Sequence, residues 1–307
     1  MIIVDFSQIM IMSISAAFNS FKEELTEDMI RHIFLNVIRE YRIKYSGEFG
    51  NELILACDGR GYWRKDYFPY YKFKRAQGRA ESPLDWEFVF KCMDNLKTDI
   101  KTYFPYKLVE VAGCEGDDVV AVLVNEFART RFVENKNAYS LDFDGATPEP
   151  ILIISADKDF LQLQLYSNVK QYSPFKKGLI TEPDIKYSRY LKILKGDVGD
   201  GVMNVFSDDD TLVTNKRQTV ASQKRLAPLI ESLMATDRLP DNTDFKIKRN
   251  FERNKTLIDL YELQIPDNLK LSIVDAYKQA PVNPRSEILK YLQKYQLKNL
   301  LSNIKDF

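Results

Sequence analysis

Histidine, cysteine and long apolar runs are scarce in this sequence, and each scarcity excludes a class of protein. His32 is the only histidine among 307 residues, so a Ser-His-Asp hydrolase or a histidine-ligated zinc enzyme would depend on one residue within an expected helix. The three cysteines, Cys57, Cys92 and Cys114, form no C-x-x-C pair, which argues against a disulfide framework and a thiolate zinc site. A reducing, intracellular setting fits this composition best.

The apolar residues are numerous enough for a sizeable core, since 45% of the chain is hydrophobic and 12% is aromatic. The apolar start MIIVDFSQIMIMSISAAF carries Asp5 and no basic residue, unlike a secretory signal peptide. No apolar run reaches the about 20 residues that a membrane helix needs. We therefore expect a soluble cytoplasmic protein with one large domain or two ordinary ones.

Charge is balanced overall, with 44 basic and 44 acidic residues, but it is unevenly distributed. The segment 59–82 is rich in basic residues with interleaved aromatic ones, the basic residues being Arg60, Arg64, Lys65, Lys72, Lys74, Arg75 and Arg79. Lysine and arginine bind phosphates, and aromatic rings stack on exposed bases. The segment is therefore a candidate nucleic-acid surface; a solvated, charged helix is the alternative.

Three short apolar runs, 2–4, 53–57 and 151–154, predict buried parallel strands. Helical patterns at 26–41, 86–104 and 119–127 alternate with them, which predicts an α/β fold with a mostly parallel, doubly wound sheet flanked by helices. Thr26 is the expected N-cap of the first helix, and Pro105 ends the second.

After Pro183 the pattern becomes helical, with expected helices at 185–194, 225–235, 257–263, 269–277 and 288–300. The chain is thus expected to divide into an α/β domain, residues 1–183, and a smaller helical domain, residues 184–307. The polar segments 131–150 and 207–219 are expected to be irregular loops.

Carboxylates stand at the ends of the predicted strands and in nearby turns. Asp5, Asp58 and Asp157 each follow a strand, so they are expected at one edge of the sheet. Paired acids also occur in Glu115-Gly116-Asp117-Asp118, Asp157-Lys158-Asp159 and Asp197-Val198-Gly199-Asp200. Helix capping explains one acid of the first group, and a plain surface turn explains the last group if it stands alone. Together the groups favour a carboxylate-lined site for Mg²⁺, where two cations about 3.5–4 Å apart can clamp a phosphodiester.

Six motifs occur in the order found in flap endonucleases and 5′→3′ exonucleases: IIVDFS, LILACDGRGYWRKD, YYKFKR, CEGDDVVAVLV, ILIISADKDF and LKGDVGD. The chain resembles this family over nearly its whole length, and within it the ribonucleases H of T-even bacteriophages. The resemblance implies a nuclease domain of the flap endonuclease or PIN-like type. It further implies a helical duplex-binding domain with a helix-three-turn-helix element.

The resemblance also implies roles for individual residues. Asp5, Asp58, Glu115 and Asp117 would hold one Mg²⁺, and Asp157, Asp159 and Asp200 the other, with Asp197 as an additional ligand and Mn²⁺ as a substitute cation. Asp118 would stand behind the ligands. Lys72 and Arg75 in a basic arch would steady the scissile phosphate, and Tyr71 would stack on a displaced base. Contacts to nucleic acid would also come from Arg64, Lys65, Lys74 and Arg79.

The implied function is a Mg²⁺-dependent 5′→3′ nuclease that removes RNA primers and 5′ flaps from nicked or branched duplexes during phage-type DNA replication. Its expected partners are DNA and RNA–DNA duplexes with 5′ ends or flaps, a single-stranded-DNA-binding protein and a sliding clamp. We expect a monomer, without membrane contact, in the cytoplasm of an infected bacterium. Two alternatives remain: a noncatalytic module that binds branched DNA, and an endoribonuclease of a related fold.

Overall fold

The computed structural model describes residues 1–21, 26–134 and 146–307, and its centre is a six-stranded sheet. The strand order is β3-β2-β1-β6-β7-β8, and every neighbouring pair is parallel except β7 with β8. The strands are β1 (Ile2–Asp5), β2 (Leu53–Cys57), β3 (Lys107–Glu110), β6 (Ile151–Ile154), β7 (Val169–Ser173) and β8 (Gly178–Ile180). The prediction of an α/β fold with a mostly parallel sheet is confirmed.

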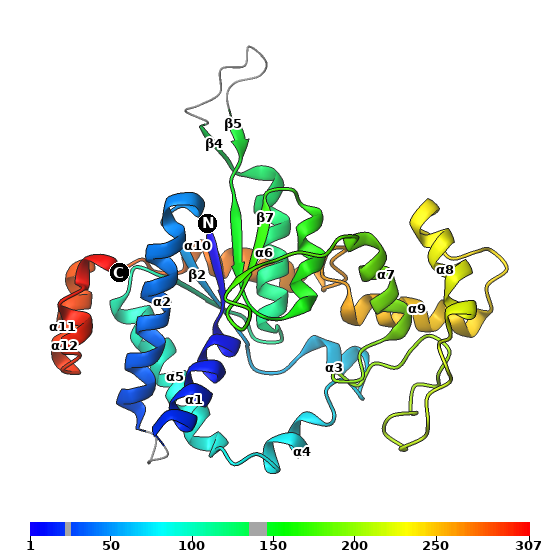
Figure 1. Ribbon diagram of the computed structural model, residues 1–307, viewed down its shortest axis with the longest axis horizontal. Helices are drawn as coiled ribbons and strands as arrows, with labels where there is room; N and C mark the ends of the chain where they lie inside the picture. Colours follow the sequence, from blue (N-terminus) through cyan, green and yellow to red (C-terminus); the bar gives the residue numbers. More distant parts are fainter. Residues whose placement is uncertain (22–25, 135–145) are drawn as a thin grey trace.

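The three strands predicted from apolar runs, β1, β2 and β6, are the most buried, because helices cover the sheet on both faces. Figure 1 shows α1 (Phe6–Phe21), α2 (Glu27–Phe49) and α5 (Trp86–Tyr103) on one side of the sheet and α6 (Gly116–Thr130) on the other. Successive residues of β1 face opposite sides of the sheet: Ile2 and Val4 pack with α1, α2 and α5, and Ile3 packs with α6.

Local signals fix the helix ends. Thr26 caps α2, as predicted, by accepting a hydrogen bond from the Met29 amide at 3.3 Å. Asp85 caps α5 in the same way. At α6, the Asp118 carboxylate accepts a hydrogen bond from the Glu115 amide at 2.9 Å, which anchors the first turn of the helix.

The chain after residue 184 is mostly helical, as predicted, and its helices form two groups. The first group, α7 (Ile185–Lys195), α8 (Gln223–Thr236) and α9 (Phe245–Ile258), packs around its own apolar cluster. The second group returns to the sheet: α10 (Asp267–Gln279) packs on α6 and β3, while α11 (Arg285–Lys294), α12 (Lys298–Leu301) and η2 (Ile304–Asp306) extend the core beside α2 and α5. Figure 1 shows α7–α9 and α11–α12 on opposite sides of the sheet. The domain boundary between residues 183 and 184 stays a prediction.

Two of the predicted helices differ from the structure. The helix predicted at 257–263 is wrong: α9, which was not predicted, ends at Ile258, and the following residues form a turn in which the Asp259 carboxylate accepts hydrogen bonds from the amides of Tyr261 and Glu262. The predicted helix at 288–300 is split into α11 and α12, since Gln296 adopts a left-handed conformation with φ 53°.

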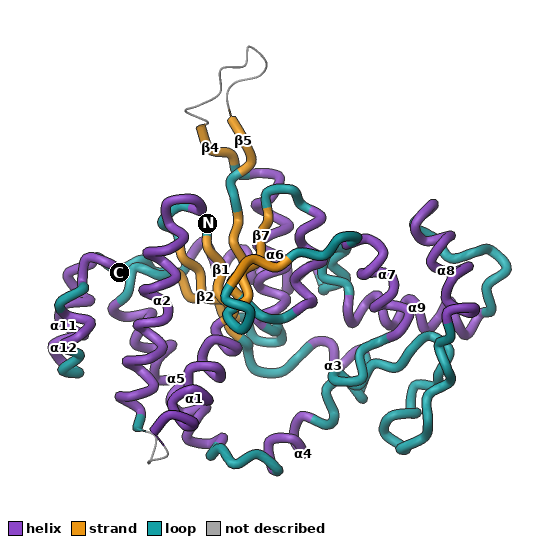
Figure 2. Tube along the Cα trace, viewed as in Figure 1, coloured by secondary structure: helices purple, strands orange, loops and turns teal. Residues whose placement is uncertain are grey.

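The expected irregular loops are only partly irregular. The ends of segment 131–150 form two short antiparallel strands, β4 (Phe132–Glu134) and β5 (Ala146–Pro148), while residues 135–145 lie outside the described residues. Segment 207–219 contains no regular element, and Figure 2 shows the long loop between α7 and α8 to which it belongs. In the described part of the chain, no helix combines the length and apolarity needed to cross a membrane.

Candidate metal and nucleic-acid site

Three strand ends bring acidic residues together at the carboxyl edge of the sheet, as predicted. The parallel pairing of β1 with β2 and β6 places Asp5, Asp58 and Asp157 side by side there. Asp117, from the first turn of α6, joins them because the Gly116 amide donates to the Asp58 carboxylate at 2.8 Å. The four acids line one cavity of about 540 Å³.

A second, much smaller cavity lies beside the first. Its volume is about 10 Å³, and its acidic residues are Asp117, Asp159, Asp197 and Asp200. Asp117 lines both cavities, so it links the two groups of acids. Asp157 lies with Asp5 and Asp58, although the sequence prediction grouped it with Asp159 and Asp200.

Glu115 is the one predicted ligand that lies behind the cavities. It is 2% exposed, and its carboxylate accepts hydrogen bonds from Arg64 Nη1 and the Tyr71 hydroxyl, each at 2.9 Å, and pairs with Lys72 Nζ. Burial acts to raise the pKa of Glu115, but Lys72 and Arg64 outweigh it and lower the pKa below its ordinary value. Glu115 is therefore a stably charged anchor for these three side chains.

Arg64 and Tyr71, which the sequence predicted to contact nucleic acid, are instead 3% exposed each. Arg64 lies in α3 (Trp63–Tyr67), where Nη1 also pairs with Asp118 at 2.7 Å and Nε donates to the Leu257 carbonyl oxygen. These contacts use the guanidinium inside the protein. We therefore assign Arg64 and Tyr71 to the support of the acidic site.

Lys72 and Arg75 lie at the predicted place, next to the acids. Lys72 is 5% exposed and left-handed at φ 54°, and its amide donates to the Asp200 carbonyl oxygen at 2.8 Å. Arg75 is more open, and its Nη2 lies 3.1 Å from Asp200. The remaining predicted contacts, Lys65, Lys74 and Arg79, are exposed on the segment that includes α3 and α4 (Arg75–Ala80).

Lys192 was missed by sequence reasoning. Its ammonium group, on α7, pairs with Asp159 and lies 3.2 Å from Asp197. Nothing in the sequence marks it, because it is one of several lysines in an amphipathic helix. It gives the smaller group of acids a counter-charge from within the chain.

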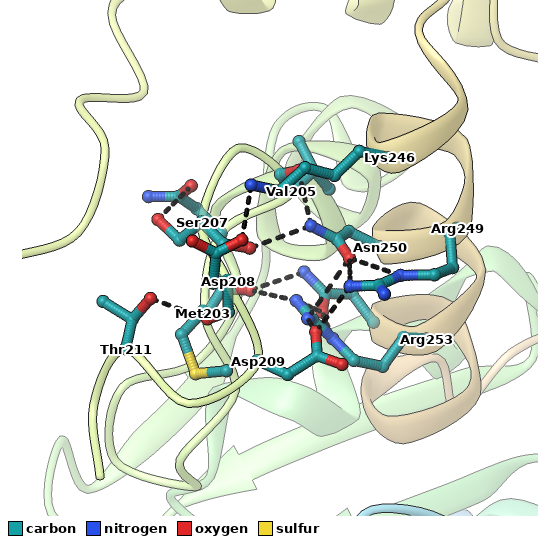
Figure 3. A network of polar contacts seen from close by, with 12 residues as sticks. Met203, Val205, Ser207, Asp208, Asp209, Thr211, Lys246, Arg249, Asn250 and Arg253 are labelled. Atoms are coloured by element: carbon teal, nitrogen blue, oxygen red, sulfur yellow. Dashed lines mark hydrogen bonds and ion pairs between the residues drawn. The ribbon is translucent and has the colours of Figure 1, made fainter. Parts of the chain in front are cut away.

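The turn that carries Asp197 and Asp200 is held by polar residues of α9. Asn254 donates from Nδ2 to the carbonyl oxygens of Ile193 and Met203, each at 2.8 Å, and so ties the end of α7 to the end of the turn. Figure 3 shows the adjoining contacts: Arg253 reaches Met203, and Asn250 donates to Val205 and Ser207. These bonds satisfy backbone carbonyls of a loop that has no regular structure.

The acids carry negative charge that the chain balances only in part. Burial raises the pKa of Asp5 to about 7, and the charges of Asp58 and Asp157 add to this effect. Burial likewise raises the pKa of Asp117, whose carboxylate has no hydrogen-bond or ion-pair partner among the described residues. A cluster of this kind is stabilised when a cation binds.

Oxygen donors of this kind suit a hard divalent cation such as Mg²⁺. Within residues 1–21, 26–134 and 146–307, no three histidine, cysteine, aspartate or glutamate side chains are already arranged to hold a metal ion. Lys72, Arg75 and Lys192 instead contact several of these carboxylates. The donor chemistry fits the metal, and the side chains would rearrange on binding.

Known proteins resemble this chain over almost all of its length. It is 34% identical to the ribonuclease H of Enterobacteria phage T4 over 316 aligned positions, which cover 99% of this chain and 95% of that protein. Residues 182–307 match the family described as T4 RNase H, C terminal.

Solved structures show the same fold. A complex of the bacteriophage T5 flap endonuclease with DNA and metal ions matches with a TM-score of 0.59 and 17% identity, over 91% of this chain and 99% of that one. The T5 5′-exonuclease with bound zinc matches with a TM-score of 0.58 and 18% identity, over 92% and 99%. These structural relatives were crystallised with divalent metal ions.

Proposed function

Because the chain belongs to the family of bacteriophage T4 ribonuclease H, and is therefore a nuclease, we propose that it removes RNA primers and 5′ flaps from nicked or branched duplexes. The proposed chemistry is Mg²⁺-dependent 5′→3′ hydrolysis of phosphodiesters. The observation that carries the proposal is the pair of acid-lined cavities that share Asp117. Phage DNA replication is the proposed setting.

Two groups of residues would hold the cations. Asp5, Asp58, Asp117 and Asp157 would serve the larger cavity, and Asp117, Asp159, Asp197 and Asp200 the smaller one. When bound, such cations activate water and neutralise charge on the phosphate and leaving oxygen.

Lys72 and Arg75 line the larger cavity, where they would bind the scissile phosphate once they release Asp200. Glu115 orients Lys72 by pairing with its ammonium group. Lys65, Lys74 and Arg79 extend the positive charge along the exposed segment, where they would contact the backbone of the displaced strand.

The first group of C-terminal helices would grip the downstream duplex. In our proposal α7, the loop at 196–222 and α8 form the helix-three-turn-helix element. Support comes from the exposed basic residues of the loop and of the start of α8, Lys216, Arg217, Lys224 and Arg225. Binding to a single-stranded-DNA-binding protein and a sliding clamp, and a monomeric state, stay predictions.

Substrate choice tests this function directly. With Mg²⁺, we expect the purified protein to cut a 5′-labelled flap duplex and an RNA-primed DNA duplex, releasing short products from the 5′ end that gel electrophoresis resolves. Cleavage confined to free single-stranded RNA would favour the endoribonuclease. Tight binding of branched DNA without any cleavage would favour the noncatalytic module.

The pH dependence of stability tests the charge of the acidic cluster. The pKa of Asp5 is raised to about 7 in the folded chain, against 3.8 for an ordinary aspartate, so between these values the folded chain keeps a proton that the unfolded chain has lost. Without divalent cations, the contribution of Asp5 to the free energy of unfolding should therefore fall as the pH rises from about 4 to 7. Urea titrations in EDTA measure this slope.

The matched control is Asp5→Asn, which keeps the hydrogen-bonding shape but cannot lose a proton in this range. Its free energy of unfolding should fall less steeply over the same pH interval. Added Mg²⁺ at pH 8 should stabilise the wild type more than the variant. Parallel curves for the two proteins, with and without Mg²⁺, would contradict the proposed charge state of Asp5.

A further inference from the structure

The turn between β7 and β8 presents an aromatic ring and two lysines that have no role in the folded core. Phe175 is 71% exposed and belongs to none of the apolar clusters of the described residues. Lys176 and Lys177 are also exposed, and neither forms an ion pair with a described residue. The turn is well formed: the Lys176 amide donates to the Ser173 hydroxyl, and Lys177 is left-handed at φ 51°.

The register of the sheet places this turn at the acidic site. Strands β6 and β7 are parallel, and Ile154 pairs with Tyr172. Both strands therefore end at the same edge of the sheet, β6 shortly before Asp157 and β7 shortly before Phe175. Gln171 fixes the two chains to each other, because its Nε2 donates to the carbonyl oxygens of Ser155 and Asp157. Phe175 accordingly lines the same cavity as Asp157.

One wall of this cavity is apolar, although hydrolysis of a phosphodiester requires only charged and polar groups. Besides the acids and the cations Lys72 and Arg75, it is lined by Ile11, Met12 and Ala16 of α1 together with Phe175. Carboxylates suit metal ions and basic side chains suit phosphates, whereas apolar and aromatic surfaces suit the face of a base. A paired base is stacked within its duplex, so the ligand that fits this wall is an unpaired nucleotide.

We propose that the tip of the β7–β8 hairpin, residues 174–177, is a binding site for the unpaired nucleotides of a 5′ end or flap. Phe175 stacks on a base, and Lys176 and Lys177 contact phosphates of the same strand. Because phenylalanine has no hydrogen-bonding group, the contact is independent of base identity and serves RNA and DNA alike. The proposal rests on the proposed nuclease function and adds a residue that positions the strand in the cavity.

Binding measurements test this site separately from cleavage. The dissociation constant is measured by fluorescence anisotropy for a 5′-flap duplex and for the same nicked duplex without a flap, with Ca²⁺ in place of Mg²⁺ and the DNA checked to be intact. Phe175→Ala should weaken binding of the flapped duplex by about 5- to 150-fold, the value of one stacked base, and leave the flapless duplex unchanged. Phe175→Trp should bind the flapped duplex at least as well as the wild type.

Leu271→Ala is the matched control, because Leu271 is 66% exposed on α10 and does not line the cavity. It should bind both duplexes like the wild type. The double variant Lys176→Gln, Lys177→Gln should reduce the salt dependence of flap binding, by about 0.7 in the logarithmic slope for each lost single-strand phosphate contact.

Unchanged flap binding by Phe175→Ala, or an equal loss for flapped and flapless DNA, overturns the hairpin site even if the wild type cleaves flaps. The proposed nuclease function fails differently, namely if the wild type with Mg²⁺ leaves the flapped duplex uncut. The two failures are therefore distinguished by one set of substrates.

Discussion

Asp117→Asn is expected to lower the rate of 5′-flap cleavage by on the order of 10³-fold or more, without loss of stability. Asp117 is the only acid in the described part of the chain that lines both acidic cavities, so its removal affects both groups of proposed ligands. Its carboxylate supports no other described side chain. Burial raises the pKa of Asp117, the charge of Lys72 opposes this effect, and the charges of Asp5 and Asp157 add to it. A neutral residue of the same shape therefore removes charge repulsion and breaks no contact.

The measurement is a single-turnover rate with a 5′-labelled flap duplex in Mg²⁺, together with a thermal unfolding curve. The neighbouring Asp118→Asn is the matched control. Asp118 lines neither cavity, and its carboxylate holds Arg64, the Trp63 indole and the Glu115 amide. This variant should lose stability and keep most of its cleavage rate. Flap cleavage by Asp117→Asn at the wild-type rate would exclude Asp117 as a metal ligand.

The fold was predictable where a single physical signal dominates. Strands buried on both faces read as continuous apolar runs, so β1, β2 and β6 were identified from the sequence. Strand β3 begins with Lys107 and ends with Glu110, and β7 and β8 lie at the other edge of the sheet; these strands alternate or are too short, so the apolar signal is weak. Which C-terminal helices return to the sheet could not be read from helical periodicity, because amphipathic helices look alike whatever they pack against.

The position of the acids was more predictable than their partners. A residue that follows a parallel strand has only one edge to occupy, which placed Asp5, Asp58 and Asp157 correctly. The grouping of acids around each cavity depends on side-chain direction at α6 and at the turn before Met203, which spacing does not determine. The burial of Arg64 could not be predicted for the same reason: one face of the short helix α3, with Trp63 and Arg64, packs inward, while Lys65, the next residue, is exposed.

Arg64→Met is expected to lower the free energy of unfolding by about 3–5 kcal/mol, the usual cost of breaking a buried ion pair by removing one partner. Arg64 is 3% exposed and pairs with two carboxylates that are themselves buried, Glu115 at 2% exposure and Asp118 at 0%. It also joins α3 to the end of α9 through the Leu257 carbonyl oxygen. Lysine at this position would keep one charge but could not satisfy both acids and the carbonyl, so Arg64→Lys should recover only part of the loss.

Chemical unfolding of Arg64→Met beside Lys65→Met decides between two roles for Arg64. If it supports the site, Arg64→Met is strongly destabilised, while Lys65→Met, an exposed neighbour on the same helix, changes stability by less than about 0.5 kcal/mol. If Arg64 instead contacts nucleic acid, as its place in a basic segment suggested, its variant unfolds like the wild type and binds flap DNA with a weaker salt dependence. In the first case Arg64 neutralises the buried carboxylates of Glu115 and Asp118 and does not contact the substrate.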